Sequence, residues 1–177
     1  MAYEIFAQDT LTTTATSIDL TSIPATHTHL ELVINARSTK VSGATDGGEL
    51  TFNGDTGSNY GTIGAYMMNS TSVSPYNLVP NSRNQLDNPF RIMNDAMTAN
   101  LYCPSKIVIP NYASTTITRK GAIIQCGTGG DSTSVYWLMI SHASWSSAAA
   151  INQITLFAES ASYPFKAGTS YYLAGWE

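Results

Sequence analysis

The segment HLELVINARS, residues 29–38, alternates between two sets of side chains. Successive side chains of a β-strand point to opposite faces of the sheet, so each set occupies one face. One set is entirely apolar: Leu30, Leu32, Ile34 and Ala36. The other is mixed and more polar: Glu31, Val33, Asn35 and Arg37. This pattern predicts an antiparallel strand with one buried and one exposed face.

The same two-residue period recurs along the chain, and no long segment shows the i, i+3, i+4, i+7 spacing of an amphipathic helix. Predicted strands cover 3–8, 18–20, 49–52, 61–68, 101–109, 122–126, 135–140, 154–158 and 171–176. Turn residues separate them, which predicts an all-β, two-sheet antiparallel sandwich of jelly-roll type with about eight to ten strands. Segment 135–140 is apolar on both faces, as in a strand at the middle of a sandwich or at a subunit contact.

The length of 177 residues fits a single domain, residues 1–177. Residues 69–88 are polar and rich in proline and asparagine, which predicts a long surface loop within an excursion near 69–100. Long loops in compact domains commonly contact partners. A short helical turn is expected within 94–99.

Composition excludes several classes of function. The net charge is −4 and no basic run exceeds Arg119-Lys120, so nucleic acid is not an expected partner. No apolar run approaches the length of a membrane span, and the N-terminal segment has no features of a secretory signal. Without a signal for export, Cys103 and Cys126 are expected to be buried free thiols with no redox role.

The segment LTFNGDTGSNY, residues 50–60, permits a calcium loop, a catalytic loop or a simple turn. Calcium prefers six to eight oxygen ligands, whereas Asp55 is the only carboxylate here. Gly54 and Gly57 suit a tight turn, which is the favoured interpretation, although calcium near Asp55 stays open.

No other pattern points to catalysis or to a cofactor. His27 and His29 would share a strand face but lack a visible third metal ligand. No G-x-S-x-G nucleophile motif and no phosphate-binding loop occurs. A pair of carboxylates could still meet in space, from among Asp46, Glu49, Asp55, Asp87, Asp95, Asp131 and Glu159. We expect neither enzymatic activity nor a cofactor.

Tyrosine and tryptophan are numerous, and both favour interfaces because one end is apolar and the other forms hydrogen bonds. We therefore expect some of them to line subunit contacts or a glycan site. The candidate interaction surface is Tyr76, Arg83, Tyr112, Trp145, Tyr163 and Trp176.

Three blocks of the sequence resemble a family of small virion proteins of tailed bacteriophages, abundant in phages of aquatic bacteria. They are SIPATHTHLELVINARS (22–38), LTFNGDTGSNY (50–60) and the segment that ends in GTSYYLAGWE (151–177). The first block departs at His27, where the family more often has tyrosine. Residues 73–100 match little, as is typical of a segment adapted to a host or to a neighbouring subunit.

The resemblance implies a structural component on the exterior of the virion, made in the cytoplasm of the bacterial host, and it names no catalytic residues. The main expectation is a capsid decoration protein that forms a homotrimer and binds phage coat subunits. The first alternative is a tail-fibre or tail-tip component that recognises the host through 69–88. The second is a carbohydrate-binding module in which Trp145 or Trp176 stacks on a host surface glycan.

Overall fold

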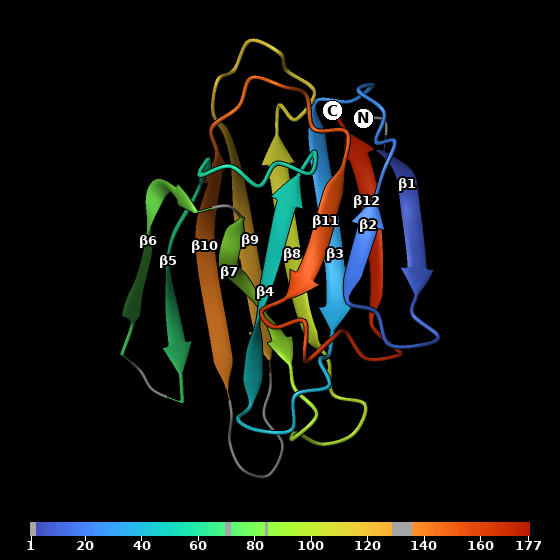
Figure 1. Ribbon diagram of the computed structural model, residues 1–177, viewed down its shortest axis with the longest axis vertical. Helices are drawn as coiled ribbons and strands as arrows, with labels where there is room; N and C mark the ends of the chain where they lie inside the picture. Colours follow the sequence, from blue (N-terminus) through green and yellow to red (C-terminus); the bar gives the residue numbers. More distant parts are fainter. Residues whose placement is uncertain (1–2, 70–71, 84, 129–135) are drawn as a thin grey trace.

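The chain folds into two antiparallel β-sheets packed face to face (Figure 1). The computed structural model describes residues 3–69, 72–83, 85–128 and 136–177, and for 77–83 and 87 the backbone alone. Within these ranges there are twelve strands and no helix, and therefore no helix able to span a membrane. The all-β sandwich predicted from the sequence is confirmed, with more strands than expected.

Eight strands form the large sheet, in the order β1-β12-β3-β8-β9-β10-β5-β6. Their bounds, in that order, are Tyr3–Thr10, Ser170–Trp176, His29–Ala36, Cys103–Pro110, Lys120–Thr128, Trp137–Trp145, Tyr60–Met68 and Ser74–Arg83. The small sheet has the order β2-β11-β4-β7. Its strands are Ser17–Leu20, Ile154–Ala158, Thr45–Phe52 and Leu86–Met93.

The core lies between the two sheets and is built by the alternation seen in the sequence. In β3, the four apolar positions of the predicted strand are at most 1% exposed. Leu32 pairs in register with Ile107 of β8 and with Leu173 of β12, so three strands contribute one continuous apolar row. Each such side chain removed from water stabilises the fold by roughly 1.5–3 kcal/mol. The other face of the large sheet is left toward solvent.

The prediction of a surface loop over 69–88 was wrong, because most of this segment forms β6 and the start of β7. Strand β7 buries Leu86, Phe90 and Ile92 completely. Pro75 and Pro80 favoured a loop in the sequence analysis, because proline cannot donate to a β-ladder. Both strands lie at sheet edges, where one side of the backbone has no partner strand and proline is tolerated.

Segment 94–101 forms turns without a helix, and the buried side chain of Arg37 holds it in place. The guanidinium donates hydrogen bonds of 2.7–2.8 Å to the carbonyls of Met97, Thr98 and Leu101. It also forms an ion pair with Asp95 at 3.1 Å. A buried cation is tolerated only when its donors are satisfied in this way. The last part of the resembling block at 22–38 therefore fastens a loop to the sheet.

Candidate functional site

The turn at 53–59 is held together, and joined to Trp145, by hydrogen bonds to the Asp55 carboxylate. Asn53 and Gly54 adopt left-handed backbone conformations, with φ of 54° and 65°. The Asp55 carboxylate accepts hydrogen bonds from the backbone of Gly57 at 2.8 Å, from Asn59 at 2.9 Å and from the Trp145 indole at 2.7 Å. The turn predicted from the sequence is therefore confirmed, and its carboxylate is occupied by protein donors.

The electrostatics of Asp55 fit this role. Burial raises the pKa of Asp55, but the hydrogen bonds from Trp145, Gly57 and Asn59 outweigh it and hold the pKa below its usual value. Among the described residues, no group of three or more His, Cys, Asp or Glu side chains is arranged to hold a metal ion.

One pair of the candidate carboxylates does meet. Asp46 and Glu159 share a hydrogen bond, and Lys40 lies 3.0 Å from Asp46. Burial raises the pKa of Asp46, which is only 1% exposed. Asp46 is buried whereas Glu159 is exposed, and their contact connects β4 with the residue that follows β11.

Both cysteines are buried and unbonded, as the sequence predicts. A hydrogen bond shared with Cys126, together with burial, raises the pKa of Cys103. The raised pKa makes the Cys103 thiol poorly reactive because the thiolate is the nucleophile, whereas the same hydrogen bond lowers the pKa of Cys126.

Two residues of the predicted interaction surface belong to the core, which corrects that prediction. Trp145 is 2% exposed and packs against Phe52 and Tyr60. Tyr112 is fully buried, and its hydroxyl donates to the carbonyl of Pro24. Large aromatic side chains stabilise a core strongly, and here the polar tip of each finds an internal partner. Neither can contact a partner protein or a glycan.

The remaining predicted residues do not form one surface. Tyr163 is 37% exposed, and Lys40 lies over its ring at 5.8 Å. Trp176 is half-buried against His29, with ring centroids 4.3 Å apart. Tyr76 lies half-buried in β6, six positions away from the strand of Trp176 in the sheet order. The side chain of Arg83 lies outside the described residues.

The main open surface is the outer face of the large sheet, which no described strand covers (Figure 1). Strands β9, β10 and β5 direct four large aliphatic side chains outward there. Their exposed fractions are 57% for Ile63, 52% for Ile123, 60% for Leu138 and 52% for Ile140. We call this region the apolar half. Monomeric proteins rarely expose so many neighbouring aliphatic side chains on one face.

Strand pairing places these side chains side by side. Ile140 pairs with Ala65 of β5 on one side and with Gln125 of β9 on the other. In the next outward row, His142 stands between Ile63 and Ile123. The register therefore gathers the four aliphatic side chains on three adjacent strands, with His142 and Gln125 among them.

A groove of about 600 Å³ runs along the apolar half between β8 and β10. Its floor lies at Gly127, which has no side chain to fill the space beside Leu138. Leu138 and Ile140 line one side, and Pro104 lies on the other. A ridge of apolar side chains from another protein would fit this shape.

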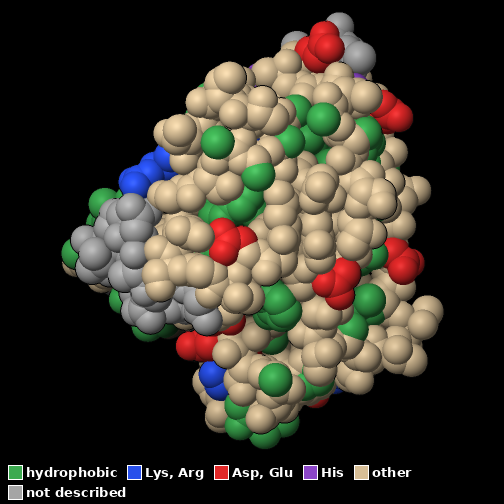
Figure 2. Space-filling model, turned by 45° about the horizontal axis from the view of Figure 1, so that its top comes forward, with side chains coloured by type: hydrophobic (Ala, Val, Ile, Leu, Met, Phe, Trp, Pro, Cys, Tyr) green, Lys and Arg blue, Asp and Glu red, His purple; other side chains and the backbone are tan. Residues whose placement is uncertain are grey.

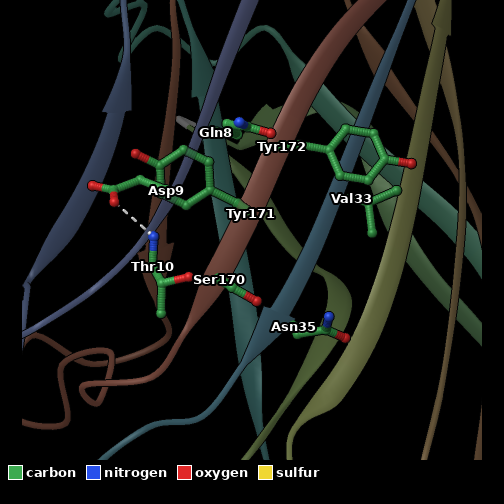
Figure 3. Close-up of a pocket in the computed structure, with 8 residues that line it drawn as sticks. All are labelled: Gln8, Asp9, Thr10, Val33, Asn35, Ser170, Tyr171 and Tyr172. Carbon is green, nitrogen blue, oxygen red and sulfur yellow. Dashed lines mark hydrogen bonds between the residues drawn. The ribbon is translucent and has the colours of Figure 1, made fainter. Parts of the chain in front are cut away.

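The other end of the same face has a different chemistry. Strands β1, β12 and β3 form a groove of about 460 Å³ lined by hydroxyl, amide and aromatic side chains (Figure 3). We call it the polar groove. Its lining residues are Gln8, Asp9, Thr10, Val33, Asn35, Ser170, Tyr171 and Tyr172.

A charged pair fixes the edge of the polar groove. The hydroxyl of Tyr172 donates to Glu31 at 2.8 Å, and Lys106 pairs with the same carboxylate at 2.7 Å. Burial raises the pKa of Glu31, but the hydrogen bonds from Lys106 and Tyr172 outweigh it and lower the pKa. Burial and the neighbouring Glu31 raise the pKa of Tyr172. The Tyr172 ring is thus held in one position by an ionised partner.

Sequence reasoning missed the polar groove, because its residues are ordinary polar side chains on three strands that are distant in sequence. The apolar half did leave a signal, since segment 135–140 is apolar on both faces. Figure 2 shows one view of the surface, on which hydrophobic and acidic side chains are scattered among other side chains and backbone.

No protein-family model matches this chain, and no curated protein matches it. Among solved structures, it is similar to the CBM40 of the Ruminococcus gnavus IT-sialidase bound to alpha2,3 sialyllactose, with 10% identity over 97% of this chain and 91% of that one, at a TM-score of 0.34. A leech intramolecular trans-sialidase shows 12% identity over 98% of this chain and 26% of that one, at a TM-score of 0.30. Similarities this low assign neither a ligand nor a family.

Proposed function

We propose that this chain is a structural protein of a bacteriophage virion that works by binding, and that the apolar half joins copies of it to one another. The observation that carries the proposal is the group of exposed aliphatic side chains on the adjacent strands β9, β10 and β5. Burying a fully exposed aliphatic side chain contributes roughly 1.5–3 kcal/mol. These four are 52–60% exposed, so covering all of them contributes roughly 3–6 kcal/mol toward association.

The part of the outer face around the apolar half is large enough for a stable interface. Strands lie about 4.8 Å apart and rise about 3.4 Å per residue, so the five adjacent strands β8, β9, β10, β5 and β6, of eight to ten residues, present roughly 650–800 Å². Stable protein interfaces bury about 800 Å² on each partner. A neighbouring copy of the chain can therefore bind to these strands and leave β1, β12 and β3 uncovered.

The blocks that resemble the phage family support a scaffold role. Residues 29–36 form a strand inside the large sheet, and β12 lies between β1 and β3 and pairs with both. Arg37 and Asp55 hold loops in place through hydrogen bonds. These residues build the fold, which supports a role in assembly.

Within the virion, we place the protein on the capsid as a decoration protein. The alternative of a tail component was based on host recognition by a loop at 69–88. Most of that segment is β6 and β7, so the recognition loop on which the tail hypothesis relied does not form there. A tail protein is present in a few copies per virion and a decoration protein in many, so the copy number of this chain per particle distinguishes the two.

Two measurements test the proposal. Sedimentation velocity of the purified chain should show a concentration-dependent oligomer, a trimer in the decoration hypothesis. Electron microscopy of particles labelled on this chain should show it spread over the head in numbers similar to the coat protein. A chain that stays monomeric at about 100 μM contradicts the role of the apolar half. A few copies at the tail favour the alternative, and absence from particles overturns the virion role.

A further inference from the structure

We infer that the polar groove binds a neutral saccharide, an activity independent of self-association through the apolar half. The groove lies at the other end of the same sheet face, on β1, β12 and β3. At about 460 Å³, its volume falls within the range of roughly 300–1,000 Å³ typical of small-ligand sites.

Two outward rows of cross-strand neighbours form the groove. One row places Tyr172 between Gln8 and Val33. In the second row, Ser170 stands between Thr10 and Asn35. Figure 3 shows the Tyr172 ring and Gln8 on one side of an open area, with Ser170 and Asn35 on the other. An aromatic side chain beside amides and hydroxyls is suited to a sugar ring, which has apolar C–H faces and hydroxyl edges.

The polar side chains of the groove are available to a ligand. Within the described part of the chain, the side chains of Gln8, Asn35 and Ser170 form no hydrogen bond with other protein groups, whereas Tyr172 is held by Glu31. Amides both donate and accept, and a hydroxyl does the same, so together they match the mixed donors and acceptors of sugar hydroxyls. The arrangement combines one fixed ring with several free polar groups.

The charge of the groove selects against acidic sugars. The ammonium of Lys106 is already paired with the Glu31 carboxylate at 2.7 Å. An anionic sugar would meet this carboxylate without a free cation to balance it. A neutral hexose or a neutral oligosaccharide avoids that cost, so we assign the groove to this class.

The test is a titration of the full chain, labelled with ¹⁵N, with neutral oligosaccharides of glucose, galactose and mannose, followed by NMR. We expect shift changes confined to the amides of β1, β12 and β3 for at least one sugar, with dissociation constants near the millimolar range. Tyr172→Ala should weaken binding at least about 10-fold, equivalent to about 1.4 kcal/mol. Tyr172→Phe, which keeps the ring but loses its hydrogen bond to Glu31, should weaken binding by only a few-fold.

Tyr136→Ala is the matched control, because Tyr136 is 62% exposed and comes directly before β10 in the apolar half. It should leave sugar binding unchanged. Absence of shifts with every neutral sugar overturns the inference, as does tighter binding of sialyllactose than of neutral lactose. Equal losses from Tyr136→Ala and Tyr172→Ala overturn it as well. Sedimentation of the same variants reports self-association separately, so failure here leaves the proposed function intact, and the reverse holds.

Discussion

The two ends of the outer face of the large sheet share one backbone architecture but present opposite surfaces. Strands β9, β10 and β5 direct isoleucine and leucine outward, whereas β1, β12 and β3 direct amides, hydroxyls and one fixed tyrosine ring outward. Both ends direct apolar side chains inward to the same core. The core of the sandwich requires only the inward side chains. The outward side chains can therefore differ between the two ends without affecting the fold, and we infer that they determine what each end binds.

This separation predicts that changes in one half leave the other unaffected. The two grooves meet at Val33, which lines both, and the ion pair between Lys106 and Glu31 lies beside it. The experiments below, from the largest expected effect to the smallest, test whether the halves are independent.

The largest effect is expected from Leu138→Lys. This change removes an exposed leucine from the apolar half and places an unpaired ammonium there, which an interface would have to desolvate. Self-association should weaken by about 100-fold, or about 3 kcal/mol, as measured by sedimentation equilibrium. Val41→Lys is the matched control, because Val41 is 75% exposed and lies outside the sheets. Equal effects of the two changes would show that the apolar half is no interface.

A smaller effect, on stability, is expected from Asp55→Asn. The change keeps the shape of the side chain but replaces a charged acceptor of three hydrogen bonds with a neutral amide. The free energy of unfolding should fall by about 1–3 kcal/mol in urea denaturation. Asp9→Asn is the control, since Asp9 is exposed and accepts only the backbone N–H of Thr10. Loss of self-association in the folded Asp55→Asn protein would contradict the separation of fold and binding.

The lowered pKa of Asp55 also makes the stability loss in Asp55→Asn depend on pH. Because the folded-state pKa is lowered, the carboxylate contributes stability above the ordinary aspartate pKa and loses it as pH falls through the folded value. The difference between the native protein and Asp55→Asn should therefore shrink in acid. A difference that stays constant down to about pH 2 would contradict this role of the charge.

The smallest effect is a pH dependence of sugar binding in the polar groove. The lowered pKa of Glu31 keeps its carboxylate ionised, and Tyr172 fixed, down to about pH 4, the ordinary range of glutamate. Binding should be level above that pH and fall a few-fold below it, measured by NMR on monomeric Leu138→Lys protein. Asp9 lines the groove as well, so Asp9→Asn separates its titration from that of Glu31. Loss of binding well above pH 5 would contradict the assignment to Glu31.

Local patterns were sufficient to predict most of the strands and the turn at Asp55. Alternation in 29–36 and glycine at 54 act over a few residues, so the sequence displays them directly. Edge strands β6 and β7 were missed because proline and asparagine resemble loop signals, and only the sheet order reveals that an edge accepts them. The buried positions of Trp145 and Tyr112 were missed because aromatic residues are equally suited to cores and interfaces.

The sequence by itself determined that this protein is an all-β sandwich with buried free thiols, because strand alternation is a property of neighbouring residues. Only the tertiary structure decided which outward residues lie next to one another. Gln8, Asn35 and Tyr172 come from three strands far apart in the chain, and Ile63 joins Ile123 and Leu138 only because β5 pairs with β10. Strand order and register are set by contacts between distant segments, and both proposed binding regions are products of that pairing.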